Sequence, residues 1–245
     1  MPARLKQMLR GMVPAWMIYR YRKWRWGHTW FEFEDRPLRD VFSEIYQHNM
    51  WGRGDGRFYS GPGSDQTVTA PYTAAIRTFI AGHSIASIVD VGCGDFRVGA
   101  QLLGPGIRYH GVDVVPALIR HNSETHGSET VQFSCLDATS EELPDGDLCL
   151  IRQVLQHLTN AEIRRALDRC RKFPYLIVTE HIASPERMTA PNAEHVHGPN
   201  TRSEAGSGVV LDAPPFVENV TGVLLELDQG DGTVLRTVVV DNRKR

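Results

Sequence analysis

Long apolar runs are missing from this chain of 245 residues, and so is any strong excess of charge. No stretch reaches the ~20 apolar residues that a membrane-spanning helix needs. The formal net charge of −2 argues against a general nucleic-acid binder, which would carry an excess of basic side chains. The length suits one α/β domain with a sizeable core, preceded by an N-terminal extension.

Cysteine is also scarce, and its placement excludes the usual paired motifs. The chain has no CxxC pair, and three of its four cysteines fall in apolar, strand-like runs. This pattern predicts reduced, buried thiols and therefore a cytoplasmic protein. A cleaved signal peptide is not expected, because Pro14 interrupts the apolar part and no small-residue cleavage site follows it.

Acidic side chains are absent from the first thirty residues, which carry seven basic ones and four of the five tryptophans. The rest of the chain carries 20 basic and 29 acidic residues, so residues 1–30 form a zone of their own. Basic residues interleaved with tryptophan suit a membrane interface, which predicts peripheral contact of residues 1–26 with the inner face of a membrane. The alternative is that these tryptophans pack on the domain or at a homodimer contact.

The remaining sequence divides into residues 31–80, expected to be a helical and lid region, and residues 81–245, expected to be the main domain. Residues 36–50 have apolar side chains at helical spacing, Gly52–Ser64 has the composition of a loop, and Tyr72–Ala81 is a second helix candidate.

Strands and helices alternate from residue 84 onward. A helix is clearest at Ala161–Lys172, and the long stretch between Ser184 and Phe216, rich in Pro, Gly, Asn and His, is expected to be a loop. The alternation predicts an α/β, Rossmann-like, doubly wound and mostly parallel sheet that ends in an antiparallel hairpin. The strands are expected at Ser87–Val91, Tyr109–Val112, Val131–Leu136, Leu148–Ile151, Tyr175–Thr179, Val223–Leu227 and Val234–Val240.

A glycine-rich turn follows the first expected strand, in the sequence Asp90-Val91-Gly92-Cys93-Gly94. Such glycines let a ligand approach the backbone, and the amides of a following helix can bind an anionic group. A dinucleotide fingerprint would require a third glycine at position 97, where the chain has Arg97. The turn therefore favours a ligand other than NAD.

This motif resembles the first motif of class I S-adenosylmethionine (SAM) dependent methyltransferases, and the resemblance covers roughly residues 84–240. It implies that Asp90 orders the methionine end of SAM. Asp113, which ends the second strand, is similar to the family's acceptor for the ribose hydroxyls, and a carboxylate can accept from both hydroxyls. Asp137, after the third strand, matches the family's acceptor for the adenine amino group.

Further cofactor contacts implied by the resemblance are Ser60, Gly61, Ser64, Gly92, Gly94, Asp95, Phe96, Val114, Ala138 and Gln153. Ser60–Ser64 would then be a lid over SAM, or else a plain surface turn. Taken singly, Asp113 and Asp137 also fit helix N-caps or turn residues. The competing classes are an NAD-dependent oxidoreductase and a non-catalytic SAM-binding partner protein.

The chemistry is expected at His157, Glu180 and His181, near the ends of the fourth and fifth strands. Ligands of open α/β sheets bind at the carboxyl ends of the strands, so these side chains should converge. A hydroxyl acceptor needs a base, and histidine titrates in a suitable range. The same three residues could hold Mg²⁺, and His195 and His197 are reserve candidates; alternatively, His157 has only a structural role.

Ser60-Gly61-Pro62-Gly63-Ser64, Leu155-Gln156-His157 and Pro214-Pro215-Phe216 together resemble bacterial methyltransferases of polysaccharide and natural-product biosynthesis. This implies an O-methyltransferase that acts on a sugar or oligosaccharide and on no specific nucleic acid. An N- or C-methyltransferase acting on another small metabolite or on RNA is the alternative. Ala213-Pro214-Pro215-Phe216 matches the catalytic motif of DNA amino-methyltransferases poorly, and we expect it to shape the acceptor site.

Overall fold

The computed structural model describes residues 33–54 and 56–244, so the predicted membrane segment, residues 1–26, lies outside the described residues. The chain divides into two compact units, Met1–Arg36 and Pro37–Arg245. Of residues 31–80, expected to be a helical and lid region, residues 37–80 belong to the same unit as the sheet. Among the described residues, no helix is long and apolar enough to cross a bilayer.

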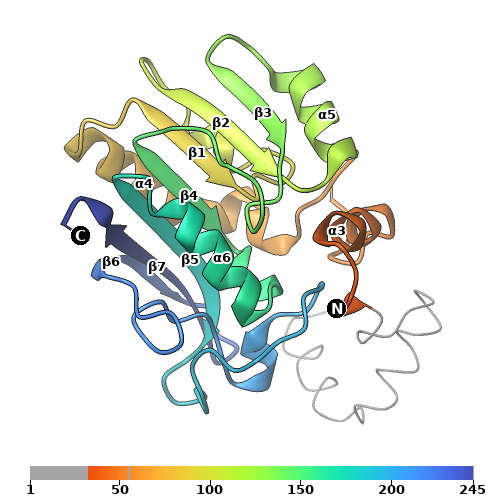
Figure 1. The fold of residues 1–245 in the computed structure, drawn as a ribbon, viewed down its shortest axis with the longest axis vertical. Coiled ribbons are helices and arrows are strands. Elements are labelled where there is room, and N and C mark those ends of the chain that lie inside the picture. The colour runs from red at the N-terminus through yellow and green to blue at the C-terminus, as the bar shows by residue number, and fades with distance from the viewer. Residues whose placement is uncertain (1–32, 55, 245) are drawn as a thin grey trace. The chain divides into compact units, whose positions relative to one another are not determined.

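A seven-stranded sheet forms the centre of the second unit, with the strand order β3-β2-β1-β4-β5-β7-β6 (Figure 1). The first five strands are parallel, and β7 and β6 continue the sheet in antiparallel pairing. This confirms the predicted α/β fold and its terminal hairpin. The strands are β1 (Ser87–Val91), β2 (Arg108–Asp113), β3 (Val131–Cys135), β4 (Leu148–Arg152), β5 (Tyr175–Ala183), β6 (Val220–Asp228) and β7 (Thr233–Asp241).

The helices of this unit are α3 (Leu38–Gln47), α4 (Gln66–Gly82), α5 (Pro116–His126) and α6 (Asn160–Cys170). Short 3₁₀ turns are η2 (Pro62–Ser64), η3 (Gly99–Leu102), η4 (Leu155–His157), η5 (Arg202–Ala205) and η6 (Asn242–Lys244). In α3 the apolar side chains at helical spacing are the buried ones. In α6 Thr159 and Glu162 form a reciprocal capping box, which satisfies two backbone amides at the helix start.

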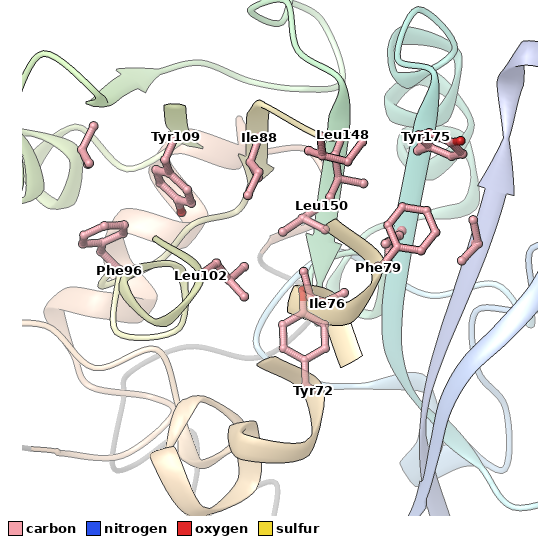
Figure 2. Packing of buried hydrophobic residues seen from close by; sticks show 14 residues of the cluster. Tyr72, Ile76, Phe79, Ile88, Phe96, Leu102, Tyr109, Leu148, Leu150 and Tyr175 are labelled. Carbon is pink, nitrogen blue, oxygen red and sulfur yellow. The ribbon is translucent and has the colours of Figure 1, made fainter. Parts of the chain in front are cut away.

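Helices α4 and α6 cover opposite faces of the sheet. Tyr72, Ile76 and Phe79 of α4 pack with Leu148 and Leu150 of β4 in one hydrophobic core (Figure 2). The intervening Cys149 points to the other face, where its sulfur lies 3.7 Å from that of Cys170 in α6. The free cysteines confirm the expected thiols, and three of the four are buried.

Several elements are longer than the sequence predicted, and helix α4 and strand β5 show why. Helix α4 begins at Gln66 rather than Tyr72, because the helix tolerates Pro71 in its second turn. Strand β5 continues to Ala183 rather than ending at Thr179, because β7 pairs with all nine of its residues. Strand β4 pairs only up to Thr179, so Glu180 and His181 lie inside β5 but just past the end of the parallel pairing.

Candidate functional site

A cavity of about 470 Å³ lies at the carboxyl ends of β1, β2 and β4, where open α/β sheets bind ligands. It contains twelve of the thirteen residues that the sequence marked as cofactor contacts. These are Ser60, Gly61, Ser64, Asp90, Gly92, Gly94, Asp95, Asp113, Val114, Asp137, Ala138 and Gln153. The structure therefore brings the predicted cofactor residues together at one edge of the sheet.

Phe96 is the exception. Its side chain is 3% exposed and does not line the cavity. It packs instead against Tyr109 and Phe133, with ring centroids 5.1 and 5.0 Å away. The sequence placed Phe96 at the site because it follows the glycine motif directly, but its aromatic side chain is held by the hydrophobic core.

The two motif glycines are required by protein neighbours as well as by their backbone conformation. Gly92 and Gly94 have positive φ values of 73° and 55°. A Cβ on Gly92 would lie 2.2 Å from Val154, and a Cβ on Gly94 would lie 2.4 Å from the hydroxyl of Ser60. Both glycines thus let the β4 end and the Ser60 loop close on the motif, a reason that the sequence pattern alone did not give.

Asp90 and Asp113 present buried carboxylates to the cavity. Asp90 accepts a 2.5 Å hydrogen bond from the Tyr109 hydroxyl, and Asp113 accepts from the amides of Gly94 and Val115. Burial raises the pKa of each carboxyl to about 6, although these hydrogen bonds oppose the shift. Carboxylates held this way favour ligands that bring hydrogen-bond donors or positive charge.

Asp137 and Asp113 also stabilise their own turns. Asp137 accepts from the amide of Thr139 at 2.8 Å, and Asp113 bonds Val115 in the same two-residue pattern. The turn role that we weighed as an alternative is therefore present, and both carboxylates still line the cavity.

The lid residue Ser60 is linked directly to the glycine motif. Its amide donates to Asp95, and its hydroxyl accepts from the Asp95 amide at 2.9 Å. The same hydroxyl lies 2.9 Å from the hydroxyl of Tyr46, at the end of α3. Burial raises the pKa of Tyr46 well above its usual range, so this phenol stays protonated. The loop thus closes over the motif through a Tyr46–Ser60–Asp95 chain.

Arg152, at the end of β4, lines the cavity and was missed by the sequence analysis. Its guanidinium donates to the carbonyl of Gly63 at 2.6 Å and lies over the ring of Tyr72. Its buried Nε has no hydrogen-bond partner among the described residues. An arginine directly before the expected Gln153 was visible in the sequence, but only the fold shows that it faces the site.

An aromatic wall, formed by Phe42, Tyr46, Trp51 and His157, closes the other side of the cavity. The Trp51 ring centroid lies 5.2 Å from that of His157, 5.4 Å from Tyr46 and 6.1 Å from Phe42. The sequence predicted helix α3, which carries Phe42 and Tyr46, but not that these residues line the cavity. Aromatic residues on the apolar face of an amphipathic helix are usually buried in a core.

His157 is held in one tautomer. Its Nδ1 lies 2.9 Å from the carbonyl oxygen of Asn200, which can only accept, so Nδ1 carries the proton. Its Nε2 then carries the lone pair and accepts a hydrogen bond from the side-chain amide of Gln156 at 3.3 Å. Burial lowers the pKa of His157 to about 4, so the ring is neutral near pH 7.

Glu180 holds the turn that carries His157 rather than facing the cavity. Its carboxylate accepts hydrogen bonds from the amides of Val154, Leu155 and Gln156, and the side chain is 2% exposed. Burial raises the pKa of Glu180 to about 7, and the three amides oppose that shift. Glu180 does not line the cavity, so it differs from the catalytic position that we expected and acts as a positioning residue for η4.

His181 lines the same cavity as His157, but its ring makes other contacts. Its Nε2 bonds the hydroxyl of Thr233, which in turn donates to Asp231 in the terminal hairpin. Burial lowers the pKa of His181. The structure thus brings both predicted histidines to one cavity, and no hydrogen bond joins them.

His195 and His197, in the loop between β5 and β6, do not line the cavity. His195 Nε2 contacts the same Asn200 carbonyl as His157, and His197 forms a buried pair with Glu162 at 2.8 Å. Within residues 33–54 and 56–244, no group of three or more His, Cys, Asp or Glu side chains is arranged to hold a metal ion.

Comparison with known proteins bears on what this cavity binds. Residues 89–173 match a family model described as a methyltransferase domain. Residues 89–173 therefore form a SAM-dependent methyltransferase domain. A search of curated proteins finds no match.

Solved structures similar to this methyltransferase domain share its fold at low sequence identity. Human N-acetylserotonin methyltransferase in complex with SAM is 13% identical, with a TM-score of 0.55 over 87% of this chain and 62% of that one. The N-methyltransferase NodS from Bradyrhizobium japonicum, in complex with S-adenosylhomocysteine, is 16% identical, with a TM-score of 0.54 over 81% of this chain and 98% of that one.

A third similar structure is the 1,6-didemethyltoxoflavin-N1-methyltransferase of Burkholderia thailandensis, which is 18% identical, with a TM-score of 0.54 over 83% of this chain and 87% of that one. The names of the human and Burkholderia enzymes give two different acceptors, and at these identities the likeness shows the fold alone. The chain spans less than two thirds of the human enzyme's length.

SAM is the cofactor, and the residues of the methyltransferase domain suit it. Among the described residues that line the cavity, the charged side chains are four aspartates and Arg152. SAM brings a sulfonium, an ammonium and hydroxyl donors, all of which are favoured near carboxylates. Arg152 is the cation available there for the methionine carboxylate. The pyrophosphate of NAD would instead meet like charge from the aspartates.

Proposed function

We propose that this domain transfers the methyl group of SAM to a hydroxyl oxygen of a sugar or oligosaccharide, with His157 accepting the hydroxyl proton. The observation that carries the proposal is the fixed tautomer of His157, which presents an unprotonated Nε2 in the same cavity as the cofactor residues. SAM supplies the methyl group when bound.

The proposed reaction moves one methyl group and one proton. The bond from the methyl carbon to sulfur breaks, a bond from that carbon to the acceptor oxygen forms, and the hydroxyl proton passes to Nε2 of His157. A base with a pKa of about 4 does not ionise the free hydroxyl, but the oxygen becomes strongly acidic as the new bond forms. The acceptor hydroxyl would replace the Gln156 amide, which faces Nε2 at 3.3 Å.

The decisive experiment measures transfer of labelled methyl from SAM to matched acceptors, methyl glucoside and its 2-amino counterpart, analysed by mass spectrometry. Label on the oxygen of both compounds supports the proposal. Label only on the amine nitrogen would assign the domain to the N-methyltransferases, the alternative that we named. EDTA added to the same assay tests the Mg²⁺ requirement: loss of activity that Mg²⁺ restores would replace His157 with a metal-assisted step.

We also propose that residues 1–26 promote binding to anionic membranes, because they combine seven basic side chains with tryptophans. Sedimentation of the full chain and of a chain lacking residues 1–26 with phosphatidylglycerol vesicles tests this. Equal, weak binding of both proteins would contradict it and favour packing or a homodimer contact for this segment.

A further inference from the structure

Charge is divided unevenly between the two sides of the cavity. Its charged lining side chains, the four aspartates and Arg152, all come from the ends of β1, β2, β3 and β4. The opposite side, which we call the acceptor half, is lined by Leu38, Phe42, Trp51, His157, Pro199 and Thr201. Among these described residues no side chain carries a charge near pH 7, because His157 is neutral there.

Trp51 is positioned to offer an apolar surface rather than a hydrogen bond. Its indole Nε1 already donates to the carbonyl of Pro199 at 3.1 Å. Its ring makes an edge contact with Tyr46 and a tilted contact with His157, and a Cβ built on Gly61 would lie 3.4 Å from the Trp51 Cβ. The ring plane is thus fixed by contacts on several sides, so little conformational entropy is lost when a ligand stacks on it.

The chemistry of this half disfavours an anionic group on the acceptor. A carboxylate or phosphate buried here would find no cation among the described lining residues, and burying an unpaired charge is costly. A ring with apolar C–H or π surface gains by packing against tryptophan, while its hydroxyl can reach the neutral His157.

We infer that the acceptor half is a binding site for a neutral six-membered ring, whose apolar face packs on Trp51 and whose hydroxyl points to His157. This rests on the proposed function, and it names the class of acceptor. Pyranosides and phenols share the required chemistry. A charged part of a larger acceptor, such as the phosphate of a lipid-linked sugar, would lie outside the cavity.

The test uses saturation-transfer NMR on the full chain loaded with S-adenosylhomocysteine, with methyl glucoside and phenol as neutral probes. Glucuronic acid and glucose 1-phosphate are their charged counterparts. We expect saturation of the ring protons of at least one neutral probe and at least a tenfold weaker signal from both charged ones. Trp51→Ala should abolish the signal and Trp51→Phe should retain it. Thermal unfolding of all three proteins controls for folding, and Trp51→Phe, which keeps an aromatic ring against Tyr46, should bind S-adenosylhomocysteine as the unaltered chain does.

Two results would overturn the neutral-ring site: charged probes that bind as well as neutral ones, or an unchanged signal in Trp51→Ala. Failure of the proposed function looks different. Rings that bind in a Trp51-dependent way but receive no methyl from SAM would leave the site standing and remove the O-transfer. Methyl transfer to a charged sugar that Trp51→Ala does not change would support the O-transfer and remove the neutral-ring site. Comparing the signals of methyl glucoside and phenol shows whether the bound ring is a pyranoside or a phenol.

Discussion

The two sides of the central cavity differ in how they are built. The cofactor half is assembled from strand ends and a glycine turn, with carboxylates at regular places in the topology. The acceptor half is assembled from α3, the turn η4 and the loop between β5 and β6, which contribute aromatic and uncharged groups. Carboxylates at a sheet edge thus follow from the topology of parallel strands, whereas the aromatic and uncharged groups of the other half come from the irregular parts of the chain.

Glu180 links the two halves, and its removal should have the largest effect. Glu180→Ala leaves three buried amides without an acceptor, at about 1–3 kcal/mol each, so the free energy of unfolding should fall by at least ~3 kcal/mol. Urea unfolding measures this. Glu180→Gln, which keeps one carbonyl oxygen, should lose less. Full stability of Glu180→Ala with loss of activity alone would return Glu180 to the catalytic role.

His157 tests the acceptor half. His157→Ala removes the proposed base and should lower kcat by about 10²–10⁴-fold. The Kd of SAM should stay within about threefold, because the ring lies in the acceptor half. Steady-state kinetics and calorimetry measure the two quantities. The exposed His48→Ala is the matched control, and His181→Ala shows whether the other histidine in the cavity is the base instead. A near-normal kcat in His157→Ala would reject His157 as the base.

Asp113 tests the cofactor half. Asp113→Ala removes a charged hydrogen-bond acceptor and should weaken SAM binding by about 1.5–3 kcal/mol. The exposed Asp145→Ala, paired with Lys172 on the surface, is the control and should leave the affinity unchanged. Calorimetry gives both values. An unchanged SAM affinity in Asp113→Ala would mean that the carboxylate serves only its own turn with Gly94 and Val115.

The pH dependence should also separate the halves, with the smallest effect. Protonation removes the base, and the pKa of His157 is about 4, so kcat at saturating SAM should stay nearly flat from about pH 8 to about pH 5.5. A base at the ordinary histidine value would lose about tenfold between about pH 7.5 and about pH 5.5.

The affinity for SAM should behave differently over the same range. Asp90 and Asp113 have pKa values raised to about 6, so acidification through that value removes their charge. The ratio kcat/KM for SAM should therefore fall below about pH 6 while kcat does not. A fall in kcat with a constant kcat/KM for SAM is the pattern that the account forbids.

The sequence predicted the cofactor half well and the acceptor half poorly, for physical reasons. Strand alternation and the glycine turn fix where Asp90, Asp113 and Asp137 lie, because the ends of parallel strands meet at one edge of the sheet. The roles of Trp51 and Arg152 depend on contacts across many residues, to Pro199 and Gly63, which no local pattern contains.

Glu180 and Phe96 also show that local sequence does not determine the role of a side chain. Both were predicted as site residues, yet Phe96 belongs to the core. Glu180 satisfies the backbone of a neighbouring turn, because β5 continues past the parallel pairing and points this side chain under η4. The positions of these two residues in the sequence predicted the region of the molecule in which they lie. The direction of each side chain determines its contacts and therefore its role.

The division of the cavity is tested most directly by titrating SAM calorimetrically into the full chain and into two variants, Asp113→Asn and Trp51→Phe. The account predicts that Asp113→Asn weakens SAM binding by about tenfold, the loss of one charged hydrogen-bond acceptor, and that Trp51→Phe leaves it unchanged. Unchanged binding in Asp113→Asn together with weakened binding in Trp51→Phe would contradict it, because SAM would then occupy the half that we assign to the acceptor.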